Sequence, residues 1–499
     1  MATDGALAIG IDLGTSGVKL VAIDDEGRVV ARASRSYPTD RPEPDSAEQR
    51  VDAWLAACDE AATELGRLAA PDRWEVIGLS AMLPTLVSLD DSLTSRWPAL
   101  TWEDGRAEPH GRAIADVIGD DRLYRSTGQR FDGRYLLAMH DRRARLGGFE
   151  NAVWAVGAKD YLFFQLTGAL VTDPSTAAGY GAYDLHTQSW DGAVLAAASD
   201  PAVPPVVPSS HHRGLLDEPA ARWGARAGIP VVVGAADSVL GAYGLDVAPS
   251  AIAYIAGTSN VVLARSSTPR PDADGRYLVT PMADDGYGLE MDLMSTGSAL
   301  AWLADLLGVD GGAAAVVDLA STADLETSPL VLPYLSPGEQ GALWDPELVG
   351  AVEGMTLRTT RGELARGLLA GIVLESRRCI FAIEESGAFG ESGTTGDGGV
   401  ERGPIAVTGS GGASAVFRQD LADATGRIVT FDPSERDHSA LGAALFAARS
   451  ALGWNARPES AARVTSHPEP ARAEIWAARF ERHERLRLAQ RIRISETTG

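Results

Sequence analysis

The sequence predicts an α/β protein made of two related domains. The main observation is a unit of strand, Gly-Thr-Ser turn and strand that occurs near the start of each half. The first copy contains Gly14-Thr15-Ser16 and the second contains Gly257-Thr258-Ser259. Length is the second observation, because 499 residues exceed what one hydrophobic core holds. We therefore expect an N-terminal domain over residues 1–248, a C-terminal domain over residues 249–499, and a cleft between them.

The first half alternates apolar runs with turn residues, which predicts strands over residues 6–12, 18–24, 28–35, 74–79 and 86–89. Residues 49–68 place apolar side chains at helical spacing, so a helix is expected there. A loop is expected over residues 98–106. Residues 110–245 look mainly helical, except for a short buried strand over 231–233 that leads into a helix.

The second half repeats this order, with helices expected over residues 298–307, 363–387, 415–425 and 439–451. A strand over residues 404–408 enters a glycine-rich turn. The stretch 387–403 is rich in Gly, Glu, Thr and Ser, which predicts an exposed loop. The charged helix expected over residues 470–493 should pack on the surface.

Each Gly-Thr-Ser turn offers backbone N–H groups and hydroxyls that can wrap a phosphate chain. An ordinary hairpin turn uses the same residues, but recurrence in both halves favours phosphate binding. Neither turn is a Walker A loop or a dinucleotide-binding fingerprint, because both of those motifs need a helix after the glycines and here a strand follows. Asp12 stands two residues before the first turn, whereas Ile255 holds that place in the second copy. A carboxylate beside phosphates suits Mg²⁺, usually through water, so only the first copy predicts a metal contact.

Asp237 follows the apolar run 231–233 and begins a helix. One interpretation is a simple helix cap, for which Asp is well suited. The other is a general base at a strand end, which phosphoryl transfer to an alcohol requires. The residues alone leave both open.

Three further groups have a plain and a functional interpretation. The cluster Gly409-Ser410-Gly411-Gly412-Ala413 is a tight strand-to-helix turn or a backbone surface for a flat ring or phosphate. Lys19 alternates with apolar neighbours, which indicates a solvated side chain. Asp104 and Arg106, close to Trp102, form a surface ion pair or contact sugar hydroxyls. The pair His211-His212 has no matching carboxylate spacing, so a metal site there is not expected.

Composition excludes several classes of function. The net charge of −24 argues against nucleic acid or an anionic membrane as a partner, since both bind basic surfaces. The two cysteines, Cys58 and Cys379, lack metal-ligand spacing and are expected to be buried free thiols in a cytoplasmic protein. No run of 18 apolar residues occurs and the N-terminus leads into a strand, so neither a membrane span nor a signal peptide is expected.

Taken together, these motifs resemble the FGGY family of carbohydrate kinases, within the superfamily of actin, hexokinase and Hsp70 ATPases. The resemblance covers nearly the whole chain. It rests on the segments 11–19, 234–238, 255–259, 332–339 with 344–346, 408–414 and 440–445, and on N-terminal segments such as Lys159-Asp160-Tyr161-Leu162.

The resemblance implies two ribonuclease-H-like, actin-like ATPase domains with ATP and Mg²⁺ in the cleft between them. Asp237 would be the catalytic base and Asp12 would help to place Mg²⁺. Both Gly-Thr-Ser turns and Lys19 would hold phosphates, and Gly409, Gly411, Gly412 and Ala413 would hold the adenosine. The sugar would contact Met82, Trp102, Asp104, Arg106 and Asp237. Domain closure would exclude water.

Departures from the family pattern concern the substrate. Xylulokinase-like members have Gln-Met-His-Gly where this chain has Ala81-Met82-Leu83-Pro84, and the Arg-Glu pair of glycerol kinases is absent. The catalytic Asp is followed by Ser238, and the Gly-Glu-Arg segment becomes Gly338-Glu339-Gln340. Arg106 would favour a sugar acid through bidentate pairing. A pentulose such as xylulose leads, with gluconate or a polyol such as erythritol as alternatives.

Two other classes of function compete with a sugar kinase. A non-metabolic ATPase of the actin or chaperone type would keep both phosphate turns but need no sugar pocket. An inactive sugar-binding regulator would not need Asp12 and Asp237. Family members are often dimers, so a homodimer is expected.

Overall fold

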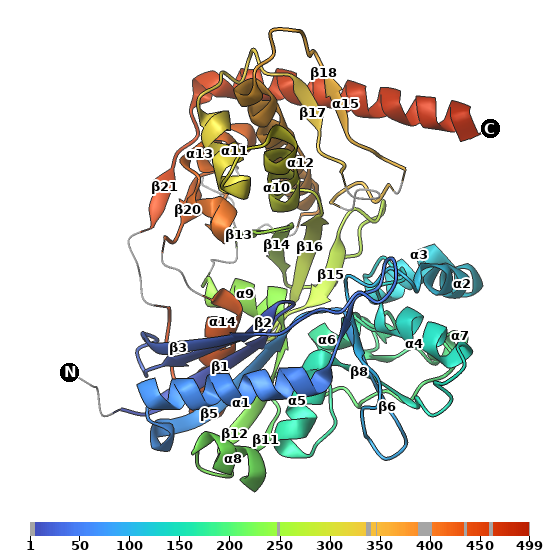
Figure 1. Ribbon diagram of the computed structural model, residues 1–499, viewed down its shortest axis with the longest axis vertical. Coiled ribbons are helices and arrows are strands. Elements are labelled where there is room, and N and C mark those ends of the chain that lie inside the picture. The colour runs from blue at the N-terminus through green and yellow to red at the C-terminus, as the bar shows by residue number, and fades with distance from the viewer. Residues whose placement is uncertain are drawn as a thin grey trace.

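Two α/β domains lie one above the other, and the chain passes between them more than once (Figure 1). The computed structural model describes residues 5–246, 250–335, 341–345, 347–387, 402–433, 437–458 and 463–498, with side chains up to Gln490. The expected boundary at residue 248, the segment Gly338-Glu339-Gln340 and residues 388–401 of the expected loop lie outside these ranges.

The N-terminal domain is built on a six-stranded sheet of order β11-β12-β5-β1-β2-β3. Its strands are β1 (Leu7–Leu13), β2 (Gly17–Ile23), β3 (Val29–Ser36), β5 (Trp74–Ala81), β11 (His212–Gly214) and β12 (Pro230–Ala236). β1 runs antiparallel to β2 and parallel to β5, and β12 is parallel to β5. The carboxyl ends of β1, β5 and β12 therefore meet at one edge, which faces the second domain.

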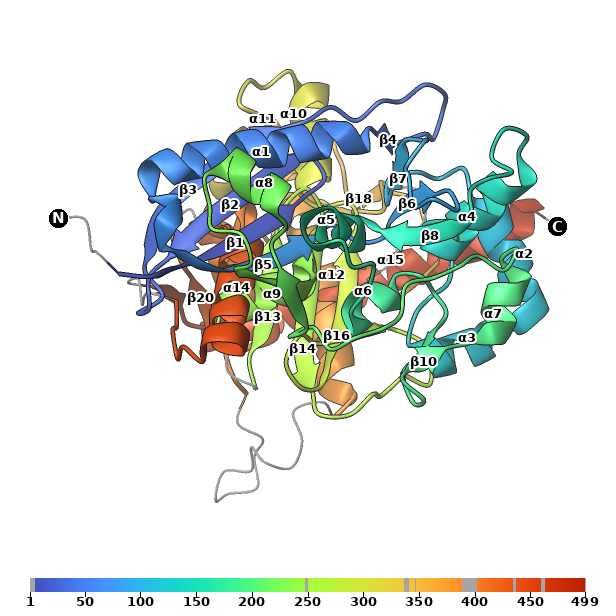
Figure 2. The same cartoon turned by 90° about the horizontal axis from the view of Figure 1, so that it is seen from below.

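Helices cover both faces of this sheet (Figure 2). On one face α1 (Val51–Leu68), α5 (Ala158–Thr167) and α8 (Asp217–Trp223) pack through Trp54, Leu162 and Trp223. On the other face lie α9 (Asp237–Gly244) and α14 (His438–Ala447).

A smaller lobe extends this domain and forms the right-hand side of Figure 1. Its four-stranded sheet has the order β4 (Glu48–Gln49), β7 (Ala99–Thr101), β6 (Thr85–Leu89) and β8 (Trp154–Gly157). Around it lie α2 (Glu108–Ile118), α3 (Asp120–Thr127), α4 (Leu136–Arg145), α6 (Pro174–Ala178), α7 (Gly192–Ala197) and the hairpin β9 (Tyr183–Asp184) and β10 (Ser189–Trp190). The segment expected as a loop over 98–106 thus contributes a short strand, β7.

The C-terminal domain has a seven-stranded sheet of order β15-β16-β14-β13-β19-β20-β21. Its strands are β13 (Ile252–Ala256), β14 (Asn260–Ser266), β15 (Leu278–Pro281), β16 (Tyr287–Leu293), β19 (Ile405–Thr408), β20 (Val429–Phe431) and β21 (Val464–Ser466). The other elements are α10 (Gly297–Leu307), α11 (Gly312–Ser321), α12 (Arg361–Glu385), α13 (Ala415–Thr425), α15 (Pro470–Thr498), and the hairpin β17 (Leu330–Leu332) and β18 (Ala351–Glu353). β13 and β14 flank the second Gly-Thr-Ser turn just as β1 and β2 flank the first, as the internal repeat predicts.

Helix α14 lies between β20 and β21 of the C-terminal domain in the chain but packs on the N-terminal sheet. Its backbone lies directly on β1 and β5 at two glycines. A Cβ atom on Gly10 would stand 1.8 Å from the carbonyl oxygen of Ala440, and one on Gly78 would stand 2.1 Å from that of Ala443. These positions must lack a side chain for the helix to lie so close. The helix therefore ties the two domains together behind the cleft.

The charged C-terminal helix α15 packs on the surface, as expected, but one stripe of it is buried. Trp476 and His483 of α15 are fully buried, and Arg479 donates from Nη1 to the carbonyl oxygen of Leu325 over 2.9 Å. One stripe of the helix packs into the core, and charged residues occupy the other positions. Because the charged positions outnumber the apolar ones, the stripe is hard to recognise in the sequence. Cys58 and Cys379 are buried free thiols, as expected.

No single helix in the described ranges has the length and apolar character to cross a membrane. Helices α10 and α11 reach that character only together, and they are bent by 83° relative to each other. Both pack on the C-terminal core through Leu303 and Val316.

Candidate active site

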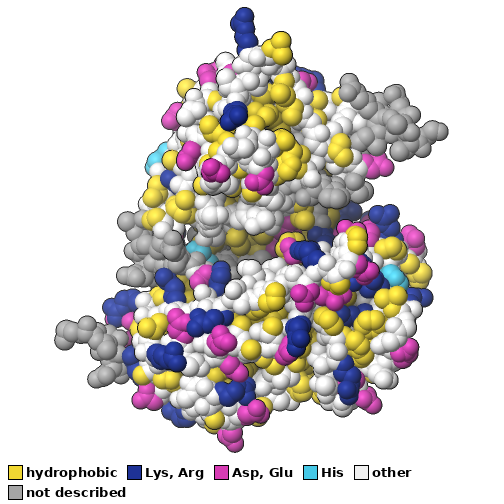
Figure 3. All heavy atoms as spheres, viewed as in Figure 1, with side chains coloured by type: hydrophobic (Ala, Val, Ile, Leu, Met, Phe, Trp, Pro, Cys, Tyr) yellow, Lys and Arg dark blue, Asp and Glu magenta, His cyan; other side chains and the backbone are white. Residues whose placement is uncertain are grey.

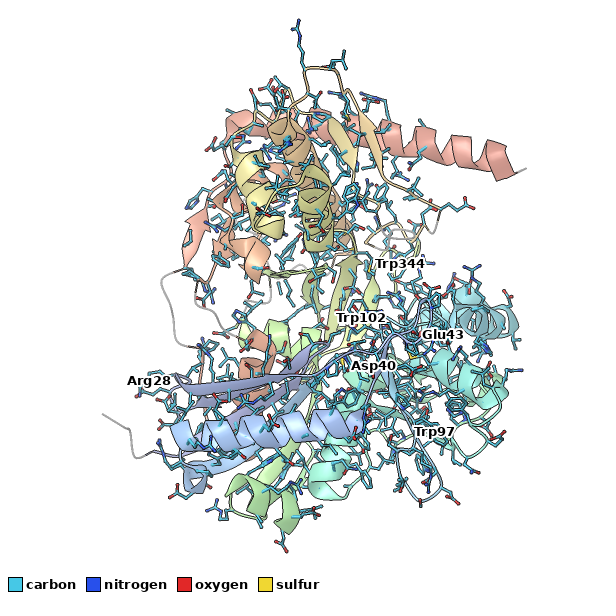
Figure 4. The ribbon with its side chains drawn as sticks, viewed as in Figure 1. Arg28, Asp40, Glu43, Trp97, Trp102 and Trp344 are labelled. Atoms are coloured by element: carbon cyan, nitrogen blue, oxygen red, sulfur yellow. The ribbon has the colours of Figure 1, made fainter. Side chains whose placement is uncertain are left out.

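A cavity of about 240 Å³ lies where the two domains face each other. The space-filling view shows a recess between the domains (Figure 3), and Trp102, labelled in Figure 4, lines the cavity from the N-terminal domain. The N-terminal domain lines the cavity with, among others, Thr15, Trp102, Arg134, Tyr135, Asp237 and Ser238. The C-terminal domain lines it with Ser259, Val261, Thr280, Glu290, Asp292 and Met294.

Asp237 lies at the carboxyl end of β12 and its side chain lines the cavity. It is the first residue of α9 and not its cap, since Ala236 holds the cap position. The carboxylate accepts one hydrogen bond, from the backbone N–H of Ser238 to Oδ1 over 2.9 Å. Burial, followed by the negative charge of Asp12, raises the pKa of Asp237 well above its usual value. A cap role does not account for a carboxylate that is turned into a cavity.

The backbone around Asp237 is fixed by groups from two distant segments. The N–H of Ala236 donates to Ser175 Oγ over 2.9 Å, and the Ser439 hydroxyl of α14 donates to the carbonyl oxygen of Asp237 over 3.0 Å. Asp237 is therefore held on a rigid strand end.

Asp12 lies in β1 opposite Ser80 of β5, and Ser80 Oγ donates to Asp12 Oδ1 over 2.7 Å. Burial raises the pKa of Asp12, while the Ser80 hydrogen bond and the charge of Lys19 act against this rise. Asp12 is close enough to Asp237 for its negative charge to raise the pKa of Asp237. The structure thus brings the predicted metal contact and the predicted base together at the strand ends.

Lys19 lies on β2, directly opposite Asp12 of the neighbouring strand β1. It is half-exposed, as its alternation predicts, but it is not free in solvent. Its Nζ forms an ion pair with Asp437 over 2.9 Å, directly before α14. Lys19 therefore links the first phosphate turn to the helix that joins the domains.

The first phosphate turn is held by three side chains of the N-terminal domain. The Tyr37 hydroxyl donates to the carbonyl oxygen of Gly14. Gln49 Nε2 donates to the carbonyl oxygen of Thr15 over 2.7 Å, and Trp102 Nε1 donates to Thr15 Oγ1 over 2.9 Å. The first two contacts take up carbonyl oxygens, and the third leaves the Thr15 O–H able to donate into the cleft.

The second turn reaches the same cavity from the opposite domain through Ser259. The Thr258 carbonyl oxygen accepts from Ser298 N over 2.9 Å and from Thr296 Oγ1 over 3.2 Å. A Cβ atom on Gly297 would stand 2.2 Å from the Gly257 carbonyl oxygen, so the start of α10 packs tightly on the turn. Thr15 and Ser259 thus line one cavity from two domains.

The predicted adenosine motif lies beside the second turn, because β19 pairs with β13. Gly409 has a φ of +86°, and a Cβ atom there would stand 2.2 Å from the Ala256 carbonyl oxygen. A Cβ atom on Gly412 would stand 2.7 Å from Phe431. Gly409 and Gly412 therefore pack directly on Ala256 and Phe431, which fixes the path of residues 409–413 beside the second turn.

Three predicted substrate residues do not line the cavity. Met82 is buried in the N-terminal core. Asp104 is fully buried and accepts from Ala47 N over 3.0 Å. Arg106 is neither at the surface nor in the cavity: its guanidinium donates to Asp104, to Glu43 and to Glu48. Of the predicted sugar contacts, the structure brings Trp102 and Asp237 to the cavity.

Sequence reasoning missed Glu290, Asp292 and Arg134, which all line the cavity. The signal for the first two is a pair of acids at alternate positions of the otherwise apolar strand Tyr287–Leu293. Arg134 Nε and Nη2 donate to Asp132 over 3.0 and 2.5 Å. Burial acts against the charge of Arg134, yet Asp132 and Asp292 raise its pKa.

No group of three or more His, Cys, Asp or Glu side chains with metal-binding geometry occurs in the part of the chain that the structure describes. Mg²⁺ in nucleotide sites keeps several waters and needs only one or two carboxylates besides the phosphates. Asp12 fits such a contact.

Comparison with known proteins identifies the family. Residues 7–244 match the N-terminal domain of the FGGY family of carbohydrate kinases, and residues 252–451 match the C-terminal domain of that family. The chain belongs to the FGGY family of carbohydrate kinases. This confirms the resemblance seen in the sequence and the actin-like fold of two domains. It also favours a sugar kinase over an ATPase of the actin or chaperone type, and it implies ATP as the phosphate donor.

Individual FGGY relatives differ in the substrate that their names record. A xylulose kinase of Klebsiella pneumoniae is 31% identical over 88% of this chain and 89% of its own length. A gluconokinase of Bacillus subtilis (strain 168) is 26% identical over 88% of this chain and 86% of its own length. Among solved structures, a xylulose kinase from Rhodospirillum rubrum is 28% identical with a TM-score of 0.84, covering 96% of this chain and 98% of that one.

Proposed function

We propose that this FGGY kinase transfers the γ-phosphate of ATP to a hydroxyl of a neutral sugar, a ketopentose such as xylulose. The observation that carries the proposal is the placement of the Asp237 carboxylate in a cavity that both phosphate turns reach. A base, two phosphate-binding turns and a cavity of sugar size are the parts that such a transfer needs.

Asp237 orients the attacking hydroxyl and accepts its proton. The Ser238 N–H holds one carboxylate oxygen. The bond that the Ala236 N–H donates and the bond that the Asp237 carbonyl oxygen accepts from Ser439 fix the backbone on either side. Because its pKa is raised, Asp237 is a stronger proton acceptor than an exposed carboxylate once it is ionised.

When bound, ATP supplies the transferable phosphate, and Mg²⁺ supplies positive charge beside it. Asp12 is the residue that would hold Mg²⁺, and the Thr15 and Ser259 hydroxyls would hold phosphate oxygens from opposite domains. Residues 409–413, which lie beside the second turn, would hold the adenine and ribose. Lys19 would also contact a phosphate oxygen if its ion pair with Asp437 opened.

The preference for a neutral sugar rests on Arg106 and on the relatives. Arg106 is the residue that would pair with a sugar carboxylate, but three carboxylates of its own domain enclose its guanidinium. The xylulose kinase of Klebsiella pneumoniae is also more similar to this chain than the gluconokinase of Bacillus subtilis (strain 168). Cytoplasmic location, a homodimeric state and the absence of nucleic-acid or membrane partners remain predictions from the sequence.

The test is ADP release by the purified protein with Mg·ATP against xylulose, other ketopentoses, ketohexoses, erythritol, glycerol and gluconate. We expect strong stimulation by a neutral ketopentose and weak stimulation by gluconate. A higher kcat/KM for gluconate would replace the proposal by gluconokinase activity. A rate of ATP hydrolysis that none of these compounds changes would exclude all of them as substrates.

A further inference from the structure

Two carboxylates of the C-terminal domain face the base across the cavity. Glu290 and Asp292 are alternate residues of β16, so their side chains lie on the same face of the sheet. Met291 between them is fully buried in the opposite, core-facing layer. Both acids line the cavity and both raise the pKa of Asp237, which places all three carboxylates around one space.

Glu290 is held in a fixed orientation. It is 8% exposed, and Thr280 Oγ1 on the neighbouring strand β15 donates to its Oε2 over 3.0 Å. Burial and the charge of Asp292 raise the pKa of Glu290 to about 7, while Ser238 and Thr280 act against this rise. Ser238 belongs to the opposite domain and follows the base, so Glu290 reaches the reacting side of the cavity.

Asp292 has fewer partners. In the described ranges no residue donates a hydrogen bond to its carboxylate, and the cation that acts on it is Arg134. Arg134 is itself bound through Nε and Nη2 to Asp132. Burial raises the pKa of Asp292, and the charge of Arg134 acts against this rise. A partly buried carboxylate with no hydrogen-bond donor is costly unless a ligand supplies one.

We call Glu290 and Asp292 together the acidic wall of the cavity. A ligand that donates hydrogen bonds to these carboxylates carries hydroxyl groups. An ionised carboxylate only accepts hydrogen bonds, and each sugar hydroxyl is a donor. A sugar acid would bring a further carboxylate beside these acids, and wherever they are ionised the like charges repel each other in the low-dielectric cleft. The Arg134 guanidinium on the same cavity is already bound to Asp132. The wall therefore favours polyols and ketoses and rejects aldonates.

We propose that Glu290 and Asp292 are specificity-determining residues, which accept hydrogen bonds from substrate hydroxyls and exclude substrates that carry a carboxylate. This inference rests on the proposed kinase activity toward a neutral sugar. It adds that discrimination comes from the C-terminal domain, on the side of the cleft opposite the base.

The test compares Asp292→Asn and Glu290→Gln with the wild type, using kcat/KM for xylulose and for gluconate. Each substitution keeps the shape of the side chain and removes its charge. We expect the ratio of kcat/KM for xylulose to that for gluconate to fall about tenfold in Asp292→Asn, as losing a charged hydrogen bond and a repulsion predicts. Asp285→Asn is the matched control, because it removes one charge from the exposed turn between β15 and β16. Its ratio should equal that of the wild type.

The outcomes separate this inference from the proposed function. If the wild type prefers gluconate, the neutral-sugar proposal falls, and the inference with it. If the wild type prefers xylulose but the ratio in Asp292→Asn stays within about twofold, only the inference is overturned. Thermal unfolding of each variant checks the fold, and partly exposed Asp292 carries the test if Glu290→Gln does not fold.

Discussion

Trp102 Nε1 donates a hydrogen bond to Thr15 Oγ1 over 2.9 Å. The two residues lie on different segments, and both line the cavity. The bond couples the segment that follows β7 to the turn that is proposed to hold phosphates. Gln49 supports the same turn from the other side, through the Thr15 carbonyl oxygen.

Trp102→Phe removes this bond and keeps most of the apolar ring. Thr15 then loses the contact that fixes its hydroxyl, which costs about 1 kcal/mol for a neutral hydrogen bond. We expect kcat/KM to fall about fivefold in steady-state assays that vary ATP and sugar separately. Trp97→Phe is the control, because Trp97 stacks near Phe149, away from the cavity. Equal losses in both variants would refute the coupling.

Asp12→Asn should raise the Mg²⁺ concentration needed for half-maximal activity by about tenfold. The amide retains an oxygen that can accept from Ser80, so the strand ends should stay in place, but the charge that attracts the metal is lost. A titration of activity with Mg²⁺ at fixed ATP measures the shift. An unchanged midpoint would remove Asp12 from the metal site.

The pH profile should show an acidic limb that belongs to Asp237. Its pKa is raised in the folded protein, so the base is protonated as pH falls through that value and kcat/KM decreases. The stability effect has the opposite sign. Protonation of Asp237 stabilises the folded state, and this contribution is lost as pH rises from the ordinary Asp range through the raised pKa.

Asp237→Asn, which cannot ionise, should therefore unfold at a higher temperature than the wild type at neutral pH while losing activity. Differential scanning calorimetry at neutral and acidic pH measures this. The difference should shrink at acidic pH, and a variant less stable than the wild type at neutral pH would contradict the burial of an ionised Asp237.

Gly10→Ala should destabilise the protein by about 1–3 kcal/mol, the usual cost of forcing extra volume into a packed site. The new Cβ would meet the Ala440 carbonyl oxygen and push α14 off β1. Urea unfolding measures the loss. Gly192→Ala is the matched control, because a Cβ there meets no atom within 4 Å. An equal effect at both sites would refute the close packing of α14.

The sequence predicts those parts of the site that depend on local chain order. The two Gly-Thr-Ser turns, Asp12 and Asp237 each follow or end an apolar strand, and parallel neighbours bring such positions to one edge. Glu290 and Asp292 could not be predicted in the same way, because they become site residues only through the meeting of the two domains.

Arg106 shows the converse case. Its partners Glu43 and Glu48 are about sixty residues earlier in the chain. The pairing of β4 with β7 brings them to Arg106, and for this reason Arg106 is bound outside the cavity. Likewise, the buried stripe of α15 is a small set of positions among many charges, and only the docked helix reveals it.

Asp237 is proposed to be the base that accepts the proton of the attacking sugar hydroxyl. The direct measurement is phosphosugar formation by Asp237→Asn and the wild type under saturating Mg·ATP and the best sugar, with ATP binding followed by calorimetry. We expect a loss of at least about a thousandfold in kcat, with ATP affinity within about threefold of the wild type. Phosphosugar formation at a rate near that of the wild type would contradict it.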